Sequence, residues 1–239
     1  TVAAPEILDA LVAKNNGSLM PYGDDSITKA AEAKIAGIFE TDAEVLIVAT
    51  GTASNSLALA TITPPWGVIF CHQGSHIYDT ECGGPEFFTG GAKMLPIEGS
   101  DGKFNAKYLD TAIKNSGMGN THHCQAAAVS ITQATETGSI YSLEEIISIS
   151  QVCKEHNLKL HMDGSRFANA VAALGCSAAE ASWKSGIDIL SFGATKNGAL
   201  SAFLLFTSAA AADPPCLNIG CGRIIEKKTQ HPLHPIHAF

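Results

Sequence analysis

The sequence of 239 residues predicts an α/β protein, a three-layer α/β/α sandwich around a mainly parallel sheet. Short β-rich apolar runs alternate along it with segments of helical period. The run "QAAAVSI" at 125–131 is nearly unbroken in its apolar character, as expected for a strand buried on both faces of a parallel sheet. The run "EVLIVAT" turns through Gly51 into a helical pattern, which is half of a βαβ unit.

Each element has its own local signal. Apolar positions at helical spacing predict helices over 5–14, 28–39, 53–62, 143–156 and 177–185. Short apolar runs predict strands over 44–50, 66–70, 92–97, 125–131, 158–163 and 187–192. Ser26 or Thr28 is expected to cap the second helix. Ser142, with Glu145 three residues later, predicts a capping box at the start of the helix over 143–156.

Composition excludes several classes of function. The formal charge of −8 and the lack of any Lys/Arg cluster argue against binding to nucleic acid or to an anionic membrane. The sequence has no apolar run of membrane-spanning length and no secretory leader, so we expect a soluble, cytoplasmic protein. Seven scattered cysteines without a CxxC pair are typical of reduced thiols.

The pattern changes after Ala202. We predict one domain over 1–202 and a divergent tail over 203–239, where Ala, Pro, Cys and His crowd together. Neither a helical nor a strand period persists in the tail, so no regular structure is predicted for it.

Three candidate groups fall at or just beyond predicted strand ends, where ligands gather in parallel sheets: Gly51 with Thr52, Asp163 and Lys196. Lys196 lies in the small and apolar stretch "ILSFGATKNGAL". We expect its amine to project into a partly dry pocket, where its pKa would fall and it would attack an aldehyde. The ordinary alternative is a solvated loop lysine.

Asp163 and Arg166 each have two interpretations. Asp163 either caps the following helix or pairs with the protonated ring nitrogen of pyridoxal phosphate. Arg166 either binds a carboxylate in bidentate fashion or is an ordinary surface arginine. The stretch "TGTASN" offers N–H groups at a helix N-terminus, which suit a phosphate dianion. It is neither a Walker A motif nor GxGxxG, so it does not imply a nucleotide.

His72 and His76 are four residues apart, near Glu81 and Cys82. On a helix, imidazoles at this spacing would meet on one face and could bind a metal ion. Gly74 and the absence of HExxH make this the weakest interpretation, so no metal is predicted. A histidine stacked on a cofactor ring, or a satisfied core histidine, is favoured.

An anion seat, an acid at one strand end and a lysine at another are together what pyridoxal 5'-phosphate requires. The stretches "PYGDD", "TGTASN", "CHQGSHIYDTECGGPEFFTGGAKML", "ITQATETGSIYSLEEI", "LHMDGSRFANAVAALG" and "DILSFGATKNGAL" make the sequence resemble one family, the low-specificity L-threonine aldolases. These are pyridoxal-phosphate enzymes of the aspartate-aminotransferase-like fold, related to the beta-eliminating lyases. The resemblance spans about 5–202.

The resemblance implies a role for each candidate. It implies that Lys196 condenses with the cofactor aldehyde, Asp163 pairs with the pyridine nitrogen, and Gly51 and Thr52 hold the phosphate. It further implies that His76 stacks on the ring and takes part in proton transfer, that Arg166 binds the substrate carboxylate, and that Tyr22 lines the site from a neighbouring subunit.

The implied reaction is aldol cleavage of L-threonine or L-allo-threonine, β-hydroxy amino acids, to glycine and an aldehyde. His76 and a water molecule remain alternative bases. A homodimer or homotetramer is implied, because the sites of this family form between subunits.

The sequence also departs from the family pattern. It begins after the family's usual first segment, and the tail over 203–239 stands where the family has a C-terminal domain. We interpret this tail as the product of a shifted reading frame or a mispredicted splice site. Two alternatives follow: an inactive fragment that retains only cofactor binding or subunit contacts, and a related pyridoxal-phosphate lyase or aminotransferase.

Overall fold

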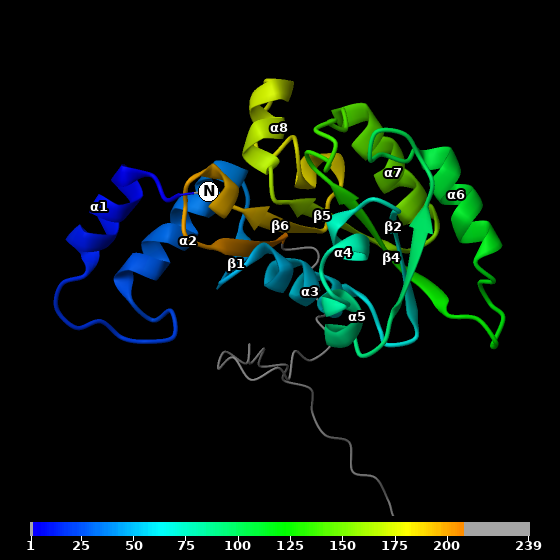
Figure 1. Ribbon diagram of the computed structural model, residues 1–239, viewed down its shortest axis with the longest axis horizontal. Helices are drawn as coiled ribbons and strands as arrows, with labels where there is room; N and C mark the ends of the chain where they lie inside the picture. Colours follow the sequence, from blue (N-terminus) through cyan, green and yellow to red (C-terminus); the bar gives the residue numbers. More distant parts are fainter. Residues whose placement is uncertain (1, 208–239) are drawn as a thin grey trace, which may run out of the picture.

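The computed structural model describes residues 2–207, which form one seven-stranded sheet with helices on both faces (Figure 1). The strands are β1 (Ala43–Val48), β2 (Gly67–His72), β3 (Lys93–Ile97), β4 (Gln125–Thr132), β5 (Lys159–Gly164), β6 (Ile189–Gly193) and β7 (Ala202–Thr207). The helices are α1 (Pro5–Lys14), α2 (Ser26–Phe39), α3 (Gly51–Ile62), α4 (His76–Asp79), α5 (Gly84–Phe88), α6 (Ala106–Asn115), α7 (Leu143–Glu155) and α8 (Phe167–Leu174), with 3-10 turns η1 (Trp183–Ser185) and η2 (Thr195–Asn197).

The strand order is β1-β7-β6-β5-β4-β2-β3. All pairs from β3 to β6 are parallel, and β7 runs antiparallel to both β6 and β1. Helix α3 packs on one face of the sheet, and α6, α7 and α8 cover the other (Figure 1). The predicted α/β/α sandwich with a mainly parallel sheet is therefore confirmed.

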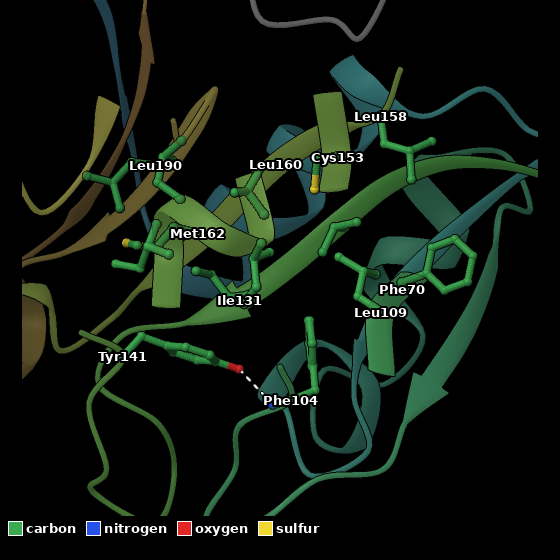
Figure 2. Packing of buried hydrophobic residues seen from close by; sticks show 14 of the residues in the cluster. Phe70, Phe104, Leu109, Ile131, Tyr141, Cys153, Leu158, Leu160, Met162 and Leu190 are labelled. Carbon is green, nitrogen blue, oxygen red and sulfur yellow. Dashed lines mark hydrogen bonds between the residues drawn. The ribbon is translucent and has the colours of Figure 1, made fainter. Parts of the chain in front are cut away.

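The side chains of β5 alternate between these two layers. Leu160 and Met162 point into the large apolar cluster beneath α6 and α7, where Figure 2 shows them with Ile131 and Leu109. The intervening His161 and Asp163 therefore lie on the opposite face, the face that α3 covers. This alternation places Asp163 against α3 at the carboxyl end of the strand.

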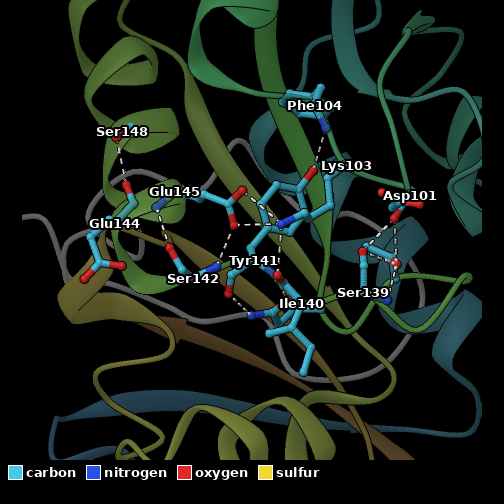
Figure 3. A network of polar contacts seen from close by, with 12 residues as sticks. Asp101, Lys103, Phe104, Ser139, Ile140, Tyr141, Ser142, Glu144, Glu145 and Ser148 are labelled. Carbon is cyan, nitrogen blue, oxygen red and sulfur yellow. Dashed lines mark hydrogen bonds and ion pairs between the residues drawn. The ribbon is translucent and has the colours of Figure 1, made fainter.

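The loop between β4 and α7 is held by polar contacts (Figure 3). The hydroxyl of Tyr141 accepts a hydrogen bond from the backbone N–H of Phe104 at 3.0 Å. Ser142 and Glu145 form the predicted capping box, and Lys103 pairs with the Glu145 carboxylate at 2.8 Å. Lys103 also donates to the carbonyl of Ile140, so this loop has a defined path beside the carboxyl edge.

Two local predictions were wrong. The cap of α2 is Asp25, whose Oδ1 accepts from the N–H groups of Ile27 and Thr28 at 2.8 Å each; Ser26 is the first helical residue. The helix expected over 177–185 is absent, because turns and η1 occupy that stretch. The helix lies earlier, in α8, and Gly175 ends it in a left-handed conformation at φ 65°.

The sheet continues past the predicted end of the domain at residue 202, because β7 runs to Thr207 between β1 and β6. A strand with neighbours on both sides need not alternate between apolar and polar residues. The lack of such alternation after residue 202 therefore did not exclude a strand there. The rest of the predicted tail, 208–239, lies outside the described residues.

Candidate active site

Asp163 is the best-anchored acid at the carboxyl edge of the sheet, with 1% of its surface exposed. Its Oδ1 accepts hydrogen bonds from the backbone N–H of Ser165 at 2.9 Å and from the Ser165 hydroxyl at 2.7 Å. Its Oδ2 accepts from the side-chain amide of Asn55 at 3.1 Å. Arg166, not Asp163, occupies the N-cap position of α8, so the capping interpretation of Asp163 was wrong.

Asn55 brings a second buried acid to the same place. It lies on α3, is 1% exposed, and its amide nitrogen also donates to Oε1 of Glu81 at 2.9 Å. Burial raises the pKa of Glu81, the hydrogen bonds from Asn55 and His76 oppose this rise, and the charge of Asp163 adds to it. Sequence reasoning did not assign Asn55 and Glu81 to the site, although a polar residue within the largely buried α3 was a usable signal.

His76 begins α4, and its Nδ1 lies 3.0 Å from Oε1 of Glu81. The side chain of His76 is 38% exposed, whereas that of Glu81 is 1% exposed. His72 is the last residue of β2, and its Nδ1 accepts from the N–H of Gly74. His72 and His76 therefore do not share a helix face, and no group of three or more metal-ligating side chains occurs within residues 2–207.

Arg166 lies next to the loop that follows β4. It donates to the carbonyl of Ala134 at 3.4 Å, and Glu136 of the same loop accepts from the backbone N–H of His76 at 3.3 Å. Burial raises the pKa of Glu136, with the charge of Asp163 adding to the rise and that of Arg166 opposing it. The loop thus links Arg166 to His76 around the buried Asp163.

Gly51 and Thr52 form the first turn of α3. The Thr50 hydroxyl caps this turn by accepting from the N–H of Ala53 at 3.1 Å. In the described part of the chain, the N–H groups of Gly51 and Thr52 have no hydrogen-bond acceptor. A Cβ added to Gly51 would lie 3.6 Å from the Ser165 hydroxyl, so these free donors are next to the Asp163 turn.

Lys196 lies in η2, beyond the end of β6, at the same edge as Asp163. A Cβ on Gly193 would lie 2.6 Å from Cα of Ser165, so only glycine lets β6 end against this turn. Lys196 itself is exposed, and the expectation of a partly dry pocket was wrong for this chain. Its loop is tied to the N-terminal segment by a hydrogen bond from Ala4 to the carbonyl of Gly198.

Tyr22 is not at this edge in the single chain. It is 81% exposed, with φ 63°, in the loop between α1 and α2. Figure 1 shows that loop at the left end of the molecule, whereas β5 lies near its middle. Its expected position at the site of a neighbouring subunit stays a prediction.

Comparisons with known proteins agree with the fold. The family described as beta-eliminating lyase matches residues 1–227. Low specificity L-threonine aldolases of Pseudomonas sp. and Pseudomonas aeruginosa are 43% and 44% identical over 212 residues, covering 87% of this chain and 60% of each relative. The chain thus spans less than two thirds of the length of these relatives.

Solved structures give the same result. A Leishmania major threonine aldolase matches with a TM-score of 0.81 and 29% identity over 88% of this chain and 61% of that chain. A putative L-allo-threonine aldolase from Listeria monocytogenes shares the fold, with a TM-score of 0.66 and 20% identity over 85% of this chain and 55% of that chain. No helix within residues 2–207 combines the length and apolar character needed to cross a membrane. The family match over nearly the whole chain means that this protein belongs to the beta-eliminating lyase family.

Proposed function

We propose that this protein binds pyridoxal 5'-phosphate and cleaves L-threonine or L-allo-threonine to glycine and acetaldehyde. The observation that carries the proposal is Asp163, a carboxylate with 1% exposure and three hydrogen bonds, beside the unpaired N–H groups of α3. Relatives named L-threonine aldolases, at 43% and 44% identity, support the substrate class.

The described residues fit the cofactor. The N–H groups of Gly51 and Thr52 would hold its phosphate, because a helix N-terminus favours a dianion. The carboxylate of Asp163 would pair with the pyridine nitrogen, and the exposed amine of Lys196 would condense with the aldehyde. When bound, pyridoxal phosphate supplies an electron sink for the bond that breaks at Cα.

The other residues act on the amino acid. Arg166 would bind the substrate carboxylate with its planar guanidinium, which matches a carboxylate in bidentate geometry. His76, or a water molecule, would take the proton of the substrate hydroxyl as the Cα–Cβ bond breaks. Tyr22 would line the site of a neighbouring subunit, and we propose a cytoplasmic homodimer or homotetramer.

Chemical labelling tests this proposal. The protein is incubated with pyridoxal phosphate, reduced with borohydride and digested, and peptide masses locate the pyridoxyl group. We expect the label on the peptide that contains Lys196. The label should remain there in a Lys107→Ala control, which alters an exposed lysine of α6, and should be absent from that peptide in Lys196→Ala. Unreduced protein mixed with threonine is then expected to release acetaldehyde.

The outcomes separate the alternatives. Label on other lysines alone, or no label, would overturn cofactor binding at Lys196. Label without acetaldehyde would support an inactive fragment or a related lyase or aminotransferase.

A further inference from the structure

A buried chain of hydrogen bonds joins the two sides of the candidate site. It runs from Asp163 through Asn55 to Glu81 and ends on the imidazole of His76, and we name it the Asn55 bridge. Its three links measure 3.1, 2.9 and 3.0 Å. The bridge connects β5, α3 and the α4–α5 segment, which are far apart in the sequence.

Asn55 uses its amide nitrogen on both carboxylates. A carboxamide nitrogen has two hydrogens, and here one is directed to Asp163 and the other to Glu81. Asn55 and the side chain of Glu81 are each 1% exposed, so the hydrogen bond between them takes the place of hydration by bulk water. Oε2 of Glu81 is buried without a partner in the described part of the chain, which leaves Oε1 as its hydrogen-bonded atom.

Glu81 constrains the proton on His76. Oε1 of Glu81 already accepts from Asn55, and when the carboxylate is ionised it only accepts hydrogen bonds, so the contact of 3.0 Å with Nδ1 then places the hydrogen on Nδ1. The neutral imidazole then keeps a lone pair on Nε2, which has no hydrogen-bond partner among residues 2–207.

We propose that Glu81 is a positioning residue, which holds the imidazole of His76 as the Nδ1–H tautomer and, through Asn55, at a fixed place relative to Asp163. The inference rests on the proposed function, because it assigns His76 a hydrogen-accepting Nε2 beside the cofactor that Asp163 would anchor. A wrong tautomer at a triad histidine is known to reduce turnover severely without moving the groups.

The first experiment reads the tautomer in the protein without cofactor. Nitrogen-15 NMR at pH 8, where an ordinary histidine is neutral, distinguishes a pyrrole-type from a pyridine-type ring nitrogen. The His76 signals are assigned by their loss in His76→Asn. We expect a pyrrole-type Nδ1 and a pyridine-type Nε2 in the natural protein, and a mixed or inverted pattern in Glu81→Gln.

The second experiment reads turnover. In Glu81→Gln we expect kcat for threonine cleavage to fall about tenfold to a hundredfold, with KM nearly unchanged, as for other residues that orient a reacting histidine. Glu86→Gln, five residues later in α5, is the matched control: it removes the same charge from the same segment without touching His76 or Asn55. Circular dichroism melting checks that each variant folds.

These measurements separate the two proposals. A natural protein with the hydrogen on Nε2, or a tautomer that Glu81→Gln leaves unchanged, would overturn the positioning role. If Glu81→Gln does not fold, Glu81→Ala provides the same comparison by removing the carboxylate that contacts Nδ1; a His76 tautomer and kcat equal to those of the natural protein would then contradict the positioning role. The expected tautomer together with no label on Lys196 would contradict the proposed function and leave the positioning role standing.

Discussion

Asp163 lies at the end of one strand and Lys196 just beyond the end of its neighbour, yet one side chain is buried and the other is exposed. Asp163 at the end of β5 is 1% exposed and accepts three hydrogen bonds. Lys196, beyond β6, is exposed and makes no hydrogen bond or ion pair within the described residues. In the proposed function, the carboxylate that would anchor the cofactor is held by hydrogen bonds, whereas the amine that would condense with the cofactor has no partner in the described residues.

Local sequence explains the contrast. At β5, a serine two residues after Asp163 folds back onto the carboxylate in a tight turn. At β6, Gly193 and Gly198 bracket η2, and Gly198 adopts φ 89°. The first arrangement adds hydrogen bonds to the carboxylate, whereas the second adds none to the Lys196 amine within the described residues.

The largest effect is expected from a substitution of the buried Asp163. Asp163→Asn keeps the shape but removes the charge that, in the proposed function, would pair with the pyridine nitrogen, and loss of one partner of such a buried pair costs about 3–5 kcal/mol. We therefore expect kcat for threonine cleavage, measured as acetaldehyde release at saturating cofactor, to fall about a thousandfold. Asp42→Asn, an exposed position before β1, is the control. A loss of less than tenfold would mean that the charge of Asp163 is not needed.

An effect of intermediate size is expected in the pH dependence of stability, and it tests how well water is excluded from the buried residues of β5. His161 is 0% exposed and hydrogen-bonded between Ser130 and Ser191, and burial lowers its pKa from 6.5 to about 4, against the opposing charge of Asp163. Between these values the unfolded state binds more protons, so stability falls as pH decreases from about 6.5 to about 4, by on the order of 3 kcal/mol. Urea unfolding across this range should show the loss, and His161→Gln should reduce its slope. Equal slopes would show that His161 titrates normally.

The smallest effect is expected in the free energy of unfolding, where substitutions near Asp163 and at Lys196 should differ. Ser165→Ala removes a hydrogen bond of 2.7 Å to the Asp163 carboxylate, so we expect the free energy of unfolding to drop by about 1.5 kcal/mol. Lys196→Ala should leave that free energy unchanged within the error of urea denaturation, because the side chain has no partner in the described residues. A larger loss in Lys196→Ala than in Ser165→Ala would reverse the comparison.

Much of the fold could be predicted because its signals are local. The capping box of Ser142 and Glu145 lies within four residues, and the apolar run of β4 lies within eight. The cap at Asp25 was missed since three polar residues in succession compete for that position. Strand β7 was missed because its place depends on pairing with β1, which lies far away in the sequence.

The position of three candidate residues could be predicted, but their contacts could not. Gly51, Asp163 and Lys196 lie at one edge of the sheet, as expected because each stands at or just beyond a predicted strand end. The link between Asn55 and Glu81 spans 26 residues and depends on how α3 packs against the following segment, which no periodicity encodes. The exposure of Lys196 is likewise a property of the assembled loops.

Strand β7 has a consequence for synthesis. Its pairing joins Ala43 to Thr207 and Val48 to Ala202, so β1 acquires its hydrogen-bonding neighbour only after nearly the whole described chain has been made. Contacts of such sequence separation slow folding, and an unpaired strand is prone to associate with other chains. During synthesis, β1 emerges well before β7, its neighbour in the described sheet, and its edge stays unpaired in the interval, when exposed strand edges are prone to aggregation.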